Sequence, residues 1–148
     1  MKNTEIIIKE DCIDDAINVS QQIPEFEDTY TKSEYESRLN NVKHLVLSAY
    51  IENKPVGFKI GYETTSKQNF YSWMGGVLPK YRQKGVAEKL YRYQEHWVKQ
   101  VGYCGILLKT RSKHKAMIKL LQKYGFIQMG IIPHNPDEET RILFEKKL

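Results

Sequence analysis

The chain has 148 residues, of which 41% are hydrophobic and 28% charged, and this composition predicts one globular domain and excludes a disordered or fibrous protein. Its apolar runs, such as Ile6–Ile8 and Ile106–Leu108, are far shorter than the roughly 20 residues of a transmembrane helix, and the charged residues around the first run are unlike a secretory signal. The net charge is +5, and the two cysteines, Cys12 and Cys104, fit neither a metal site nor a disulfide framework, so we expect a cytoplasmic protein with no bound metal and no membrane partner.

The first half of the chain predicts alternating short strands and helices. In chain order we expect a strand over Glu5–Lys9, a helix over Asp14–Gln22 that ends before Pro24, and a loop over Glu25–Tyr30. A second helix over Lys32–Leu39 and a buried strand over Leu45–Ile51 follow. From Val56 to Tyr62, apolar or aromatic residues alternate with glycine and lysine, and this period of two is the clearest strand signal in the sequence. The short turn at Asn53–Pro55 joins these last two strands into a predicted hairpin.

The second half contains the longest predicted helix. A strand over Phe70–Leu78 includes Gly75-Gly76, and paired glycines inside a strand indicate a bulge or a close backbone approach. The long helix follows over Val86–Val101, with Gly102 as its C-terminal cap. The last predicted elements are a short strand over Ile106–Lys109, an amphipathic helix over Met117–Tyr124, and two final strands over Phe126–Ile132 and Ile142–Glu145. Strands that alternate with helices predict an α/β fold whose mixed sheet has at least one parallel pair. Because no repeat or linker divides the chain, we expect a single domain over residues 1–148.

Positive charge is concentrated in one third of the chain. Twelve Lys/Arg and two Asp/Glu lie between Lys80 and Tyr124, so this third has a net charge of +10 and the remainder −5. Such a distribution suits nucleic acid, a phosphorylated cofactor, or simply solvated helix faces.

The segment from Gly75 to Ala87 carries the clearest functional signal. A strand ends, Pro79 interrupts it, a basic loop follows, and a long helix begins at Gly85. The start of a helix presents free backbone N–H groups and a positive dipole end, which together bind phosphate. The segment is neither the nucleoside-triphosphate loop nor the dinucleotide fingerprint, because the Lys-Ser/Thr pair of the first and the three glycines of the second are missing.

Two motifs resemble the GNAT superfamily of N-acetyltransferases. Arg82-x-x-Gly85-x-Ala87, directly after Val77-Leu78-Pro79, resembles its acetyl-CoA signature, and His114–Phe126 is similar to its later helix, which ends in Gly-Phe. The resemblance implies a central mixed, mostly antiparallel sheet of about six to seven strands with a splayed parallel pair, flanked by about four helices.

The resemblance also implies a binding site for acetyl-CoA as the cosubstrate. Pantetheine would lie between the strand before the loop and its parallel neighbour, Cys104–Lys109, with the glycine pair as the bulge that causes the splay. The pyrophosphate would lie on the loop N–H groups. The implied cofactor residues are Gly75, Val77, Leu78, Arg82, Gln83, Lys84, Gly85, Val86, Ala87, His114 and Met117.

The catalytic residues are less directly indicated. The superfamily often has a tyrosine, the acid for the CoA thiolate, where this chain has Leu121, and Tyr124 is either a substitute acid or a core residue. Tyr71 and Glu63 are candidate bases, although an unshifted tyrosine with a pKa near ~10 is a poor one. The acidic loop with Glu25, Glu27 and Asp28 either attracts a cationic amine or is a solvated surface.

Together these features predict an N-acetyltransferase that moves the acetyl group to a primary amine of a small molecule or peptide, by direct attack in a ternary complex. The alternative is a non-catalytic acyl-CoA-binding regulatory module, since Leu121 replaces the usual tyrosine. A nucleic-acid partner is disfavoured because the basic residues lack an interleaved aromatic platform. Dimers are common in the superfamily, so a homodimer is an expectation from the resemblance alone.

Overall fold

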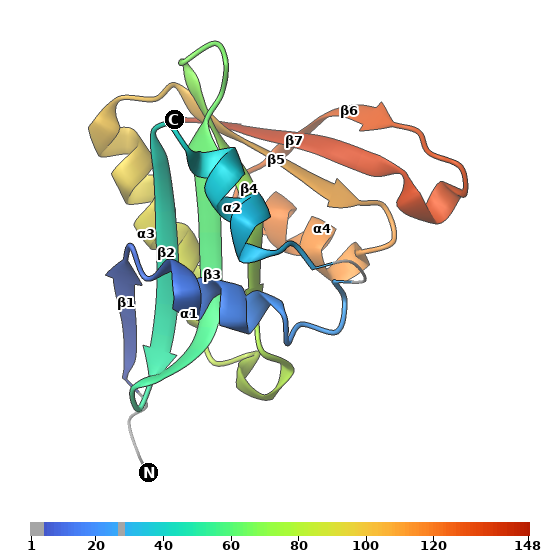
Figure 1. The fold of residues 1–148 in the computed structure, drawn as a ribbon. Coiled ribbons are helices and arrows are strands. Elements are labelled where there is room, and N and C mark those ends of the chain that lie inside the picture. Colours follow the sequence, from blue (N-terminus) through green and yellow to red (C-terminus); the bar gives the residue numbers. More distant parts are fainter. Residues whose placement is uncertain (1–4, 27–28) are drawn as a thin grey trace.

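A seven-stranded sheet forms the centre of the molecule, with the strand order β1-β2-β3-β4-β5-β7-β6 (Figure 1). The computed structural model describes residues 5–26 and 29–148. The strands are β1 (Ile6–Glu10), β2 (His44–Ile51), β3 (Lys54–Glu63), β4 (Asn69–Val77), β5 (Gly105–Arg111), β6 (Ile127–Ile132) and β7 (Arg141–Lys147). The α-helices are α1 (Ile13–Ser20), α2 (Lys32–Leu39), α3 (Val86–Val101) and α4 (Lys115–Lys123).

All neighbouring strands run antiparallel except β4 and β5, which run parallel with α3 between them in the chain. The predicted sheet, with its single parallel pair and four flanking helices, is therefore confirmed. In the described part of the chain, no helix combines the length and the apolar character that a membrane crossing requires.

The sheet separates two hydrophobic cores. On one face, Ala16, Ile17 and Val19 of α1 and Tyr35 of α2 pack against Phe58 and Ile60 of β3. On the other face, Val86, Leu90 and Val98 of α3, together with Leu121 of α4, pack against residues such as Leu47 and Phe70. A sheet that is covered on both faces buries side chains of both parities, which is why β2 is buried almost throughout its length.

Local sequence explains where the helices begin and end. Thr31 and Glu34 form a capping box at the start of α2, and glycines with positive φ, Gly85 and Gly102, flank α3. Both helices have the predicted bounds. Two short 3-10 turns, Pro79–Tyr81 and Asp137–Glu139, were not predicted, because each is too short to show a periodic pattern.

The glycine pair of β4 is not a bulge, so that prediction is wrong. Gly75 and Gly76 pair in regular register with Lys59 and Phe58 of β3. The extra residue is Trp73, because Met74 pairs with Ile60 while Ser72 pairs with the adjacent Gly61.

Gly76 instead accommodates the close approach of another segment, which is the second role that the sequence predicted for the glycine pair. A Cβ on Gly76 would lie 2.4 Å from Cδ1 of Ile23, which follows α1. The absence of a side chain therefore lets the segment after α1 lie directly on β4.

We predict that Gly61→Ala destabilises the protein. Its Cβ would lie 2.3 Å from the buried ring of Phe70 and 2.7 Å from the backbone oxygen of Tyr71. Overpacking of this kind lowers the free energy of unfolding by ~1–3 kcal/mol. Chemical denaturation measures the change, with Gly130→Ala as the matched control, because nothing lies within 4 Å of a Cβ there. Equal stabilities of the two variants would contradict the prediction.

Candidate active site

The gap between β4 and β5 is the first feature of the site. The two strands pair only from Asn69–Ser72 to Gly105–Leu108. Beyond Ser72, β4 stays paired with β3 as far as Val77, while β5 stays paired with β7 as far as Arg111. Figure 1 shows the strands diverging, and within the described ranges the edge of β4 from Trp73 to Val77 has no strand partner on the β5 side. This divergence is the predicted splay.

The loop between β4 and α3 presents backbone N–H groups. Gln83 and Gly85 have φ of 62° and 89°, and residues of positive φ within a turn direct successive N–H groups to one side. The first bond within the helix runs from the N–H of Lys89 to the oxygen of Gly85, so the helix itself does not satisfy the N–H groups of Val86–Glu88. Nothing lies within 4 Å of a Cβ on Gly85, so an anion has room to approach. Gln83, Lys84 and Ala87 are exposed, while Val86 is buried in the core.

A small pocket of about 250 Å³ lies beside this loop. Lys54 and Lys84 line it together with Tyr81, whose ring centroid is 5.7 Å from Nζ of Lys54. Lys54 is the first residue of β3, distant in the chain from Lys84, and only the fold places the two side by side. The two lysines add positive charge beside the loop, and the carboxylate of Glu52, which lines the same pocket, offsets part of it.

Arg82 is held by the protein itself. Its Nε donates to the backbone oxygen of Val77 at 3.0 Å, and its terminal nitrogens donate to both carboxylate oxygens of Glu25 at 2.8 and 2.9 Å. These bonds from Arg82 and, to a smaller extent, the charge of nearby His114 lower the pKa of the Glu25 carboxyl. The guanidinium therefore ties the loop between β4 and α3 to the segment between α1 and α2. The predicted acidic neighbours of Glu25, Glu27 and Asp28, lie outside the described residues.

The helix α4 follows β5, the strand on the other side of the gap. His114 precedes the helix and is half-buried, and Met117 in its first turn is 40% exposed. Leu121, where the resemblance implies a tyrosine, is only 3% exposed and packs in the core with Phe126. A buried leucine has no proton to give, so any acid must come from another residue.

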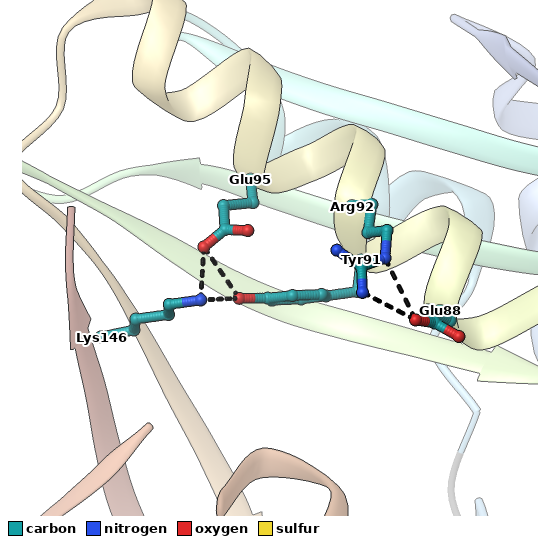
Figure 2. Close-up of polar contacts among 5 residues, drawn as sticks. All are labelled: Glu88, Tyr91, Arg92, Glu95 and Lys146. Carbon is teal, nitrogen blue, oxygen red and sulfur yellow. Dashed lines mark hydrogen bonds and ion pairs between the residues drawn. The ribbon is translucent and has the colours of Figure 1, made fainter. Parts of the chain in front are cut away.

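Tyr124, the predicted substitute acid, is the C-cap of α4 and stacks on Tyr91 of α3. The ring centroids are 4.2 Å apart and the planes differ by 3°. Figure 2 shows what holds Tyr91: Lys146 donates to its hydroxyl at 2.8 Å, and that hydroxyl donates to Glu95 at 3.0 Å. Burial raises the pKa of Tyr124, which keeps its proton on at neutral pH and also makes it a weaker acid.

The two candidate bases, Tyr71 and Glu63, lie at the end of β4 that is still joined to β5. Burial raises the pKa of Tyr71, which makes its phenolate still less accessible at neutral pH. Glu63 accepts a hydrogen bond from the hydroxyl of Tyr103 at 3.0 Å and pairs with Phe70, where β4 and β5 are still joined. It lies four residues, roughly 13 Å, along β3 from Lys59, the residue opposite Gly75.

An aromatic pocket lies on the other face of β4, at the Trp73 bulge. The Trp73 ring is 5.2 Å from the rings of Tyr30 and Tyr35, and the Arg38 guanidinium lies 4.6 Å above it. Arg38 also donates to the Tyr62 hydroxyl at 3.1 Å. The pocket, of about 590 Å³, is lined by Tyr30, Ser33, Glu34, Ser37, Arg38 and Trp73. Sequence reasoning missed it, because its members come from three separate segments.

The sequence matches the model of the acetyltransferase (GNAT) family over residues 13–126, and the chain belongs to that family. It is therefore an acetyl-CoA-dependent N-acetyltransferase. Among curated protein sequences, no relative matches the chain.

Solved structures share the fold at low sequence identity. The ribosomal-protein-S18-alanine N-acetyltransferase of Escherichia coli is 17% identical with a TM-score of 0.82, over 97% of this chain and 94% of that one. Ard1 of Thermoplasma volcanium is also 17% identical, with a TM-score of 0.83 over 97% of each chain. An aminoglycoside 6'-N-acetyltransferase complexed with coenzyme A is 19% identical, with a TM-score of 0.75 over 95% of this chain and 96% of that one.

We predict that Arg82 and Glu25 act as one unit in acetyl-CoA binding. Arg82→Ala and Glu25→Ala should each weaken binding about 3- to 10-fold, and the double variant should be no weaker than Arg82→Ala, because both substitutions remove the Arg82–Glu25 ion pair and only Arg82→Ala also removes the bond to Val77. Isothermal titration measures the affinities. A loss in Arg82→Ala with none in Glu25→Ala would contradict the role of Glu25 and leave Arg82 to act through Val77 or the phosphates.

Proposed function

We propose that the protein transfers the acetyl group of acetyl-CoA to the primary amine of a small molecule or peptide, by direct attack in a ternary complex. The observation that carries this proposal is the placement of both candidate binding regions on one stretch of β4. The edge from Trp73 to Val77 borders the gap on the β5 side, and Trp73 lines the aromatic pocket toward α2. Two substrates bound there meet without a covalent enzyme intermediate.

The cofactor side has the groups that a CoA thioester needs. The N–H groups from Gln83 to Ala87 would hold the pyrophosphate, with Lys54 and Lys84 beside them. The unpaired edge at Gly75 and Val77 would pair with pantetheine amides, Leu78 would support the turn, and His114 and Met117 would border the thiol end. A backbone N–H in the gap would polarise the thioester carbonyl.

The acceptor would lie in the aromatic pocket. Its volume suits a small molecule or the terminal residue of a peptide, and its rings provide flat apolar surfaces. Its proton would leave to a base or to water, since the raised pKa of Tyr71 disfavours that residue as the base.

A non-catalytic acyl-CoA-binding module is the second candidate. The observation in its favour is the buried Leu121 at the position of the usual tyrosine. The two candidates differ in whether a bound thioester is consumed.

We further propose a cytoplasmic homodimer. Free Cys12 and Cys104 suit a reducing compartment. The edge strand β6 exposes Ile127, Met129 and Ile131 at 67%, 55% and 58%, which favours burial against a second copy. Light scattering on the purified protein measures the mass, and a monomer across micromolar concentrations would refute the dimer.

The test of the proposed function is thiol release from acetyl-CoA across a panel of aminoglycosides, polyamines, amino acids and peptides, with thermal shift on the same samples. Release with one amine class supports the transferase and identifies the acceptor. Binding of acetyl-CoA without release for any amine supports the regulatory module.

We predict that Trp73→Ala raises the KM of the acceptor about tenfold, because a stacked ring contributes roughly 1 kcal/mol or more to binding. The affinity for acetyl-CoA should change less than about twofold. Trp97→Ala is the matched control, since Trp97 packs against Phe70 rather than in the pocket. Steady-state kinetics measures both variants, and equal effects on acceptor KM would contradict the assignment of this pocket.

A further inference from the structure

Lys59 places a positive charge on one face of the central sheet. It lies on β3 directly opposite Gly75 of β4. Its neighbours of the same parity, Gly57 and Gly61, face α3 and Phe70, so Lys59 points to the α3 face as well. Its Cγ lies 3.5 Å and its Nζ 3.7 Å from the position that a Cβ on Gly75 would occupy. The side chain therefore runs across the sheet from β3 to β4.

Glycines are the neighbours of this lysine on its own face of the two strands. Gly57 and Gly61 flank it on β3, and Gly75 faces it on β4. Other side chains cover the first two, namely Val86 and Leu90 at Gly57 and Phe70 at Gly61, whereas the Lys59 side chain itself lies over Gly75. Of the glycine pair that the sequence singled out, Gly76 is thus approached by Ile23 and Gly75 by Lys59.

The ammonium has no counter-ion. Within residues 5–26 and 29–148, no hydrogen bond or ion pair to Lys59 is found, and burial alone lowers its pKa to about 8. A partly buried charge without a partner destabilises a fold. Buried charged side chains without a partner are concentrated at functional sites.

Lys59 also lies next to the gap. Gly75 is beyond the last β4–β5 pair, Ser72 with Leu108, so it belongs to the unpaired edge of β4. This is the edge at which, in the proposed function, the thioester end of acetyl-CoA binds. Leu121, at the usual position of the acid, is a buried core residue.

We propose that Lys59 is a catalytic residue, the cation that stabilises and protonates the departing CoA thiolate. This assignment rests on the proposed acetyl transfer. The acceptor amine forms a bond to the thioester carbonyl carbon and loses one proton to water, while the C–S bond breaks and its electron pair goes to sulfur. The Lys59 ammonium gives one proton to that sulfur and becomes a neutral amine, and the proton released by the acceptor amine returns to Lys59 through water.

The acidity of Lys59 suits this step. Thiols have a pKa near ~8.5, so proton transfer from a lysine with a pKa of about 8 is nearly balanced in energy. An ordinary lysine, with a pKa of ~10.4, would hold its proton more tightly.

Among the described residues that pair with Lys59 or are buried on α3, one titrates. Lys59 pairs with Leu47 of β2 and with Gly75 of β4, and neither of these titrates. The buried residues of α3 are Val86, Leu90, Tyr91, Gln94 and Val98. Among them only Tyr91 titrates, and its hydroxyl is bonded to Lys146 of β7 and to Glu95 of α3.

The decisive variant is Lys59→Met, which keeps the length of the side chain and removes the charge. We expect kcat to fall about 10²- to 10³-fold, acetyl-CoA affinity to change less than about threefold, and Tm to rise because an unpaired buried charge is lost. In the wild type, kcat should decline as pH rises through about 8, since the acid must be protonated, and this limb should be absent in the variant. Lys147→Met, at an exposed lysine of β7, is the matched control and should alter none of these quantities.

A second measurement needs no acceptor. The thiol of bound CoA is titrated by the ultraviolet absorbance of its thiolate, in the wild type and in Lys59→Met. A cation beside the sulfur should make the thiolate form at lower pH in the wild type. If this shift is present but no amine releases thiol, acetyl transfer is wrong while the location of Lys59 beside the sulfur stands.

Three results would overturn the assignment. The first is an unchanged kcat and pH limb in Lys59→Met, with the same thiolate titration as the wild type. The second is a large loss of kcat in Tyr124→Phe with none in Lys59→Met, which assigns the proton to Tyr124. The third is an acetyl group on Lys59 itself after incubation with acetyl-CoA, detected by peptide mass spectrometry, because an acetylated lysine carries no charge.

Discussion

The parting of β4 from β5 after Ser72 determines the rest of the site. Backbone N–H and C=O groups need partners, and a strand edge inside a sheet normally has them. Here β5 follows β7 and β4 follows β3, so the edge from Trp73 to Val77 has lost its neighbour. A ligand with amide groups of its own can take the place of the missing strand. Because α3 begins just beyond that edge, the free N–H groups at Gly85 lie in line with it.

The two faces of β4 contact different groups of side chains. Toward α1 and α2, the Trp73 bulge adds a ring to the aromatic cluster around Arg38. Toward α3, the Lys59 side chain lies over Gly75. The basic third of the chain forms the loop between β4 and α3, then α3, β5 and α4, so the charge excess is concentrated around the gap.

Local sequence signals were sufficient for most of the fold. The alternation in β3, the apolar face of α3 and its capping Gly102 depend on residues close in the chain, and these elements lie where they were predicted. The parallel pair and its splay also followed from the element order and the family resemblance. The bulge was assigned to Gly75-Gly76, but it is at Trp73, because register depends on which residues of β3 face β4, and no local pattern encodes that pairing.

The sequence by itself determined the family, the helix start at Gly85 and the mixed sheet, since each rests on short-range spacing. Only the tertiary structure decided which side chains meet. It joined Arg82 to Glu25, stacked Tyr124 on Tyr91, and placed Lys59 beneath Gly75. These contacts link residues that are distant in the chain, and their geometry depends on strand register and on the space that neighbouring side chains leave. That is the physical reason why these contacts could not be predicted from the sequence.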